Sequence, residues 1–145
     1  MRWATWQRVG IDRMACAWLI LRYIDPAAEF LFVEYGQPPP GDAEAFDIPG
    51  ARLTHRRGRC TFSTILREYG LRDPALDRLS EIITGADVPG NFFDHPESAG
   101  LEAVCRGISR TAGDDHVAIR HGLVVFDGLY RLFSDAAGPP APVRP

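Results

Sequence analysis

One apolar stretch near the N-terminus, residues 11–26, constrains the fold of this chain more than any other part of the sequence. Its apolar residues would lie almost all the way round a helix: Cys16, Trp18, Leu19, Ile20, Leu21, Tyr23 and Ile24. A helix that is apolar on most faces is buried inside its domain. Asp12 can cap this helix, because a carboxylate accepts hydrogen bonds from the first-turn N–H groups. Pro26 ends it, because proline disfavours helical geometry in the residue before it. The stretch therefore predicts one central, buried helix.

The first turn of this predicted helix is polar. Asp12 and Cys16 stand four residues apart, so they share a face, and Arg13 lies between them. In the functional interpretation, Asp12 is a ligand or base, Arg13 binds an anion, and Cys16 is a thiol nucleophile or ligand. In the structural interpretation they are a cap, a surface arginine and a buried small hydrophobe, since free cysteine is among the most buried residue types. The residue types leave both open.

The remaining pattern predicts an α/β domain. Residues 2–8 and 28–35 have strand-like composition on either side of the first helix, so we expect a parallel βαβ unit. Further helices are expected at 62–69, capped by Thr61 and ended by Gly70, and at 74–85, capped by Asp73. Two more are expected at 96–109 and 114–133, the last starting at Asp114 or Asp115 and using Gly122 and Gly128 as packing contacts. A short strand is expected at 51–55. We predict a single, mainly helical domain of about five helices, with a small sheet of short strands near the N-terminus. The domain should cover residues 1–134, followed by an Ala/Gly/Pro tail without structure at 135–145.

Charge and cysteine content restrict the functional classes. The net charge of −3 argues against direct nucleic acid binding, and no apolar run is long enough to cross a membrane. Three cysteines are an odd number without paired spacing, which favours free thiols in the cytoplasm over disulfides. All 16 basic residues are arginine, so any basic site should suit oxyanions. The sequence leaves a homodimer open.

A second polar cluster occupies residues 55–60. It joins one imidazole, three guanidiniums and a thiol at the start of a predicted helix: His55, Arg56, Arg57, Arg59 and Cys60. A helix N-terminus and nearby cations favour an anion and can lower the pKa of a thiol. This predicts an oxyanion site or a reactive thiol; the alternative is a solvated loop with an inert cysteine. If the protein is an enzyme, Cys16 and Cys60 are the candidate catalytic residues.

Carboxylates and imidazoles elsewhere could complete a metal site. Asp115 and His116 begin the last predicted helix, and Asp87 lies in a predicted loop. Together with Asp12 and His55 they are the candidate ligands for a transition-metal ion such as zinc or iron. The alternative for Asp115 and His116 is a role at the positive end of a helix. No pair of these residues has the spacing of an established metal motif.

Several motifs in order carry a family resemblance. They are Ile11-Asp12-Arg13 with Ala15-Cys16 and Trp18-Leu19-Ile20, Phe46-Asp47-Ile48-Pro49-Gly50, His55 with Cys60-Thr61-Phe62, Tyr69-Gly70-Leu71 with Asp73-Pro74-Ala75-Leu76, Gly85-Ala86-Asp87, Ala99-Gly100-Leu101, and Asp114-Asp115 with Val125-Phe126-Asp127 and Leu129-Tyr130. The chain resembles the C-terminal domain of the chromate-resistance protein ChrB. It departs from that pattern at Ala17, where the family usually has proline, and in its more basic 56–59 segment. We expect a domain that stands alone, without the N-terminal region of longer regulators.

The resemblance implies a part in chromate resistance, and three hypotheses follow. The first is a module that binds or senses a metal ion or a small oxyanion such as chromate. The second is a metal- or thiol-dependent oxidoreductase that acts on chromate. The third is a protein-interaction domain without small-molecule chemistry. Convergence of Asp12, Cys16, His55 and Asp115 or His116 would favour a metal site, whereas convergence of the arginines on Cys60 would favour an oxyanion site.

Overall fold

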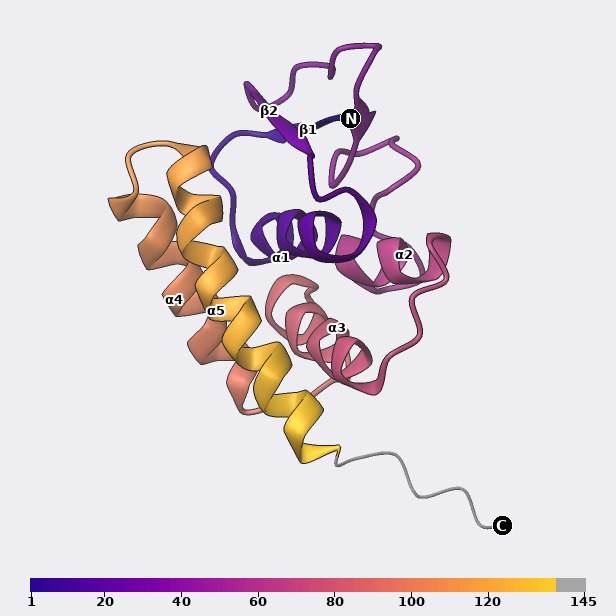
Figure 1. The fold of residues 1–145 in the computed structure, drawn as a ribbon, viewed down its shortest axis with the longest axis vertical. Coiled ribbons are helices and arrows are strands. Elements are labelled where there is room, and N and C mark those ends of the chain that lie inside the picture. The colour runs from indigo at the N-terminus through magenta and orange to yellow at the C-terminus, as the bar shows by residue number, and fades with distance from the viewer. Residues whose placement is uncertain (138–145) are drawn as a thin grey trace.

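A small parallel sheet lies at one end of the molecule, and the helices pack beneath it (Figure 1). The computed structural model describes residues 1–137. Its elements are β1 (Arg2–Trp6), α1 (Ile11–Leu19), η1 (Ile20–Ile24), β2 (Glu29–Val33), β3 (Glu44–Ala45), α2 (Thr61–Glu68), α3 (Pro74–Asp87), α4 (Glu97–Thr111) and α5 (Asp115–Ala136). The strand order is β2-β1-β3, and both pairs are parallel. The predicted α/β class, the five α-helices and the βαβ start are confirmed.

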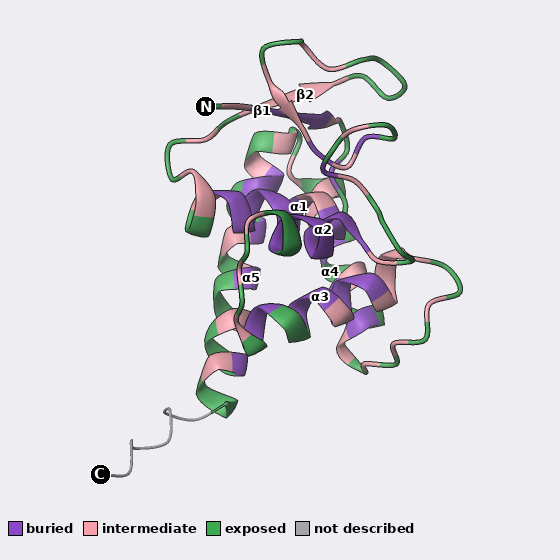
Figure 2. Cartoon of the chain, turned by 90° about the vertical axis from the view of Figure 1, so that its right-hand side faces the viewer, coloured by how far each residue is buried: buried purple, intermediate pink, exposed green. Residues whose placement is uncertain are grey.

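Helix α1 is the centre of the domain. Every residue from Met14 to Leu19 is buried, and α1 contacts α2, α3, α4 and α5 (Figure 2). The central helix predicted for this stretch is therefore confirmed. Its last turns widen into the π-helix η1, where the Asp25 N–H donates to the Ile20 carbonyl at 2.7 Å. The chain then leaves the helix immediately before Pro26.

Two predicted helix caps are confirmed and two are wrong. Asp73 caps α3 by accepting from the Ala75 N–H, and Asp114 caps α5 by accepting from the Val117 N–H. Asp12 does not cap its own helix: the N-cap of α1 is Gly10. Thr61 does not cap α2 either; it is the first helical residue, after Cys60 as N-cap. Both misassigned side chains make contacts with distant segments, which a local pattern does not reveal.

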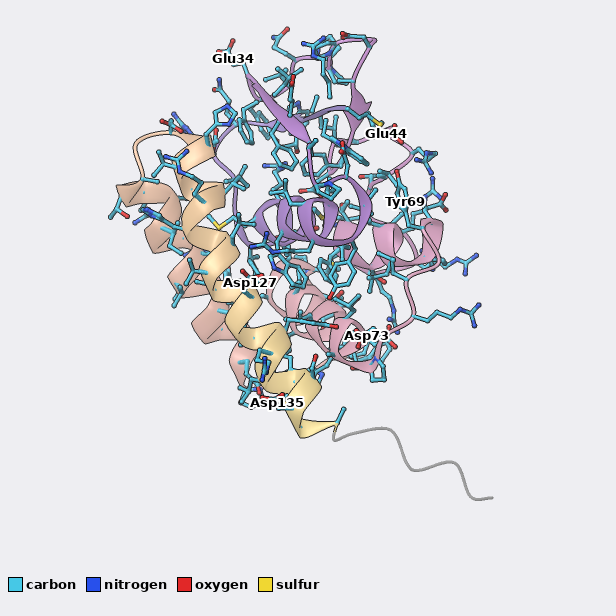
Figure 3. All side chains as sticks on the ribbon, viewed as in Figure 1. Glu34, Glu44, Tyr69, Asp73, Asp127 and Asp135 are labelled. Carbon is cyan, nitrogen blue, oxygen red and sulfur yellow. The ribbon has the colours of Figure 1, made fainter. Side chains whose placement is uncertain are left out.

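Helix α5 lies along α1, α3 and α4, and Asp127 and Asp135 on it are labelled in Figure 3. Gly122 lies against Met14, where an added Cβ would come within 3.3 Å of the Met14 sulfur, so its predicted packing role is confirmed. The same prediction for Gly128 is wrong, because open space surrounds that glycine. The helix continues to Ala136, past its predicted end at residue 133. The rest of the predicted tail, 138–145, lies outside the described residues.

One further difference concerns a short segment. The strand predicted at 51–55 is absent; this segment forms a single bridge between Phe46 and Leu53. Within residues 1–137, no helix has the length and apolar character needed to cross a membrane.

Candidate metal centre

The carboxylate of Asp12 joins two helices. Its Oδ2 accepts the Thr61 N–H at 2.9 Å and its Oδ1 accepts the Phe62 N–H at 3.0 Å. These are first-turn N–H groups of α2, which have no partner within their own helix. Asp12 therefore caps α2 from α1, and its side chain is only 2% exposed. A buried anion of this kind requires hydrogen-bond donors or a cation nearby.

His55 is the cationic partner of Asp12, and the carboxylates of Asp47 and Asp87 also lie next to its imidazole. His55 Nε2 lies 3.0 Å from Asp12 Oδ2, 3.3 Å from Asp47 Oδ1 and 3.2 Å from Asp87 Oδ2. One imidazole nitrogen carries at most one proton, yet three carboxylates face it. We call Asp12, Asp47, His55 and Asp87 the acidic cluster.

Asp47 is held at the cluster by a turn with unusual backbone geometry. Its φ is 53°, in the left-handed region that aspartate tolerates better than most residues. Buried Phe46 and Ile48 anchor the turn on either side. Asp47 Oδ1 accepts the Thr61 hydroxyl at 2.6 Å, and its Oδ2 pairs with Arg13 Nε at 3.1 Å. Arg13 is thus neutralised by Asp47.

Asp87 reaches the cluster from the last residue of α3, which continues beyond the predicted end at residue 85. One ligand atom each from Asp12, His55 and Asp87 lies within 4.8 Å of the other two. A transition-metal ion bound by two carboxylate oxygens and one imidazole nitrogen needs ligand distances of about 2.0–2.2 Å, which this spacing can accommodate. The structure therefore brings together three of the five predicted metal ligands.

The electrostatics of the cluster also favour a cation. Hydrogen bonds to Asp12, Asp47 and Asp87 raise the pKa of His55 to about 12, so this imidazole is protonated at neutral pH. Burial raises the pKa of Asp12, and the charges of Asp47 and Asp87 act in the same direction. The imidazolium proton therefore compensates carboxylates that would otherwise repel one another.

The cluster opens into a cavity of about 610 Å³. Its lining comprises Trp6, Arg8, Gly10, Asp12, Arg13, Tyr35, Asp47, Pro49, Thr54, His55 and Asp87. A small molecule could reach the cluster from this side, because the cavity is large enough for a small ligand.

The two cysteines predicted as catalytic residues lie beneath the cluster rather than in the cavity. Cys16 is fully buried and its Sγ donates to Asp12 Oδ1 at 3.5 Å. Cys60 is also fully buried, with its Sγ near the Ser80 carbonyl and the Thr84 hydroxyl. Burial raises the pKa of both thiols, and the charge of Asp12 raises them further. These placements keep both thiols neutral and do not favour nucleophilic chemistry.

The arginines predicted for an oxyanion site do not converge. Residues 56–59 form a tight hairpin, in which Arg57 and Gly58 both have positive φ, as a type I′ turn requires. Arg56 pairs with Glu68, and Arg59 stacks over the Phe93 ring at 4.9 Å. None of these arginines lines the cavity of the acidic cluster; only Arg13 of the predicted set does so.

Asp115 and His116 are not brought to the cluster. Asp115 accepts hydrogen bonds from the N–H groups of Arg8 and Val9, at 3.1 and 2.9 Å. The His116 ring packs edge-on against Phe32, with centroids 4.8 Å apart. Asp115 thus organises the segment between β1 and α1, a role that its sequence position did not reveal.

Comparison of the sequence with known proteins identifies the family of this chain. The model of the family described as "ChrB, C-terminal domain" matches residues 3–133. The chain belongs to the ChrB C-terminal domain family. Protein ChrB of Cupriavidus metallidurans is 41% identical over 134 residues, which cover 92% of this chain and 41% of that protein. The chain therefore spans less than half the length of this ChrB relative. No solved structure matches the chain significantly.

Each residue of the acidic cluster lies in a motif that carried the ChrB resemblance. Asp12 follows Ile11, Asp47 is in the Phe46–Gly50 turn, His55 precedes Cys60-Thr61-Phe62, and Asp87 ends Gly85-Ala86-Asp87. Asp47 is the cluster residue that sequence reasoning missed. The available signal was an acid between two apolar residues of a turn. Burial of those neighbours draws the acid toward the interior, where a charged side chain needs a partner.

Proposed function

We propose that this domain serves chromate resistance by binding a divalent transition-metal ion at the acidic cluster, with Asp12, His55 and Asp87 as ligands. The observation that carries the proposal is the convergence of three carboxylates on one imidazole nitrogen. A metal ion would take the place of the His55 proton and would be shared by carboxylates that a single proton cannot satisfy.

The donor atoms fit zinc or iron. Imidazole nitrogen and carboxylate oxygen are common ligands of both metals. The two N–H groups from α2 and the thiol of Cys16 already orient the Asp12 carboxylate, as outer partners orient metal ligands in other proteins. Asp47 is a further carboxylate beside the site, held by Thr61 and Arg13.

The proposed role is binding or sensing, and it does not use thiol chemistry. Both thiols near the site are fully buried and have raised pKa values, so neither presents a thiolate to the cavity. Through the cavity, a small ligand could reach the proposed metal site, whereas neither thiol lines that cavity. Occupation of this site would fix the relative positions of α1, α2 and α3, which each contribute to it or contact it.

Calorimetric titration of the metal-free protein with Zn²⁺, and with Fe²⁺ under anaerobic conditions, tests this function. We expect one ion per chain for at least one metal. His55→Gln and Asp87→Asn should each weaken binding by at least about tenfold, since each removes a ligand worth roughly 1.4 kcal/mol or more. Asp77→Asn on the exposed face of α3 and His121→Gln on the exposed face of α5 are matched controls that should leave affinity unchanged.

Two results would overturn the proposal. One is a metal-free protein that binds neither ion while circular dichroism shows it folded. The other is binding that the control variants weaken as much as His55→Gln and Asp87→Asn do.

A further inference from the structure

The segment Arg8–Gly10 separates two hollows of the molecule. One is the cavity of the acidic cluster, and the other, of about 640 Å³, lies toward α4 and includes Arg106 and Arg110 in its lining. Arg8, Gly10 and Asp87 line both. Arg8 therefore lines the cavity of the proposed metal site as well as the second hollow.

Arg8 has a backbone conformation that arginine rarely adopts. Its φ is 62°, in the left-handed region, which is strained for a non-glycine residue. The N–H groups of Arg8 and Val9 both donate to the Asp115 carboxylate, which holds the segment in this form. Asp115 is free to do so because Asp114 caps α5. Glycine would fit this backbone without strain, whereas arginine adds a guanidinium beside the cavity.

The charge of Arg8 is not used within the part of the chain that the structure describes. Arg13, the other guanidinium of the cavity, pairs with Asp47, whereas the exposed Arg8 forms no ion pair with any carboxylate of residues 1–137. A divalent ion at the acidic cluster would add positive charge to the cavity that Arg8 lines, and so would favour binding of an anion there.

We propose that Arg8 binds a small oxyanion in the cavity of the acidic cluster once a metal ion is bound, and that Asp115 is the residue that positions Arg8. The proposal rests on the metal site proposed above. A guanidinium offers two parallel N–H donors to a tetrahedral or planar oxyanion, and such charge-assisted bonds are the strong ones. Metal and anion should therefore each tighten the binding of the other.

The test is calorimetric titration of the zinc-loaded protein with sulfate and with phosphate, after zinc affinity has been measured for every variant. Wild-type protein should bind at least one of these anions more tightly with zinc than without. Arg8→Gly should weaken anion binding about 10- to 100-fold, the range expected for a charged hydrogen bond. The same variant should melt at the wild-type temperature or above, because glycine relieves the left-handed strain. Arg120→Gln, an exposed arginine on α5, is the matched control and should bind like wild type.

Asp115→Asn separates positioning from general structural support. Alone it should weaken anion binding, whereas in the Arg8→Gly background it should change anion affinity no further. Equal effects in both backgrounds would show that Asp115 does not act through Arg8. Zinc binding with no measurable sulfate or phosphate binding, or with anion affinity unchanged in Arg8→Gly, would overturn the inference and leave the metal site standing. Absence of zinc binding would instead overturn the proposed function.

Discussion

Asp12 combines a structural and a proposed ligand role in a single side chain. Its two oxygens accept two first-turn N–H groups of α2, and one of them also lies 3.0 Å from His55 Nε2. Both functions depend on burial, because hydrogen bonds and charges act more strongly away from water. A substitution at Asp12 should therefore affect folding as well as binding.

Asp12→Ala should lower the free energy of unfolding by about 2–4 kcal/mol, because two buried N–H groups and the Cys16 thiol lose their acceptor. Urea unfolding of the metal-free protein measures this. Asp77→Ala, at an exposed position, should change stability by only about 0.5 kcal/mol. An Asp12→Ala protein as stable as wild type would show that the carboxylate is not the cap of α2.

His55 should give the metal-free protein a characteristic pH dependence. Its folded pKa of about 12 lies above the ordinary value of 6.5, so its contribution to stability is complete below about pH 6.5 and is lost as the pH rises toward 12. In urea unfolding with chelator present, wild type should lose stability between pH 7 and pH 10 relative to His55→Gln. Parallel pH profiles for the two proteins would contradict this assignment.

The three thiols should react slowly in the folded protein. Cys16, Cys60 and Cys105 are fully buried, and burial raises the pKa of each, to about 12 for Cys105. We expect Ellman's reagent to modify all three in urea and fewer than one per chain within minutes in native buffer. Rapid native labelling that disappears in Cys60→Ser or Cys16→Ser would restore the thiol hypothesis.

At the level of elements, the contact between α1 and α5 explains why α5 has a glycine at position 122, but it does not explain Gly128. Gly122→Ala would press on Met14, whereas Gly128→Ala would meet only open space. Gly128→Ala should stabilise the protein by about 0.5–1 kcal/mol through helix propensity. Gly122→Ala should gain less or lose stability, because the Met14 side chain must move. Thermal unfolding of the two variants side by side checks this order, and the reverse order would contradict the packing.

Helices and strands could be predicted from the sequence where residues close together in the chain determine them. The Asp73-Pro74 and Asp114 starts, the Gly70 stop and the βαβ order all follow from neighbours in the chain. Helix α3 runs past Gly85, and that glycine packs closely against Ser98 of α4, where an added Cβ would come within 2.7 Å of the hydroxyl. A glycine that serves such a contact has the same appearance in sequence as a glycine that ends a helix.

The site was predictable in part for the same reason. Asp12, His55 and Asp87 were recognisable as candidate ligands by their chemistry. Asp115 was a candidate ligand but lies away from the cluster, and Asp47 lies in the cluster although it was not a candidate. The partners that decide both positions are distant in sequence: Arg8 and Val9 for Asp115, and Thr61 for Asp47. Such pairings come from tertiary packing, which no local period encodes.

At the scale of the whole molecule, the fold gathers four acidic-cluster residues that are spread along the chain from Asp12 to Asp87. They come from the start of α1, the turn after β3, the residue before the 56–59 hairpin and the end of α3. Packing of α1 against α2 and α3 makes this convergence a property of the core. Four of the motifs that carry the ChrB resemblance therefore lie where the chain passes the cluster.

X-ray absorption spectroscopy of the zinc-loaded protein tests the central claim most directly, because it reports the ligand atoms themselves. The account predicts a first shell of nitrogen and oxygen at about 2.0–2.2 Å, with an imidazole signal that His55→Gln removes and His121→Gln retains. A sulfur shell at about 2.3 Å would mean that zinc is held by cysteine, and an imidazole signal unaffected by His55→Gln would place the metal elsewhere. Either result would contradict the assignment of the acidic cluster as the metal centre.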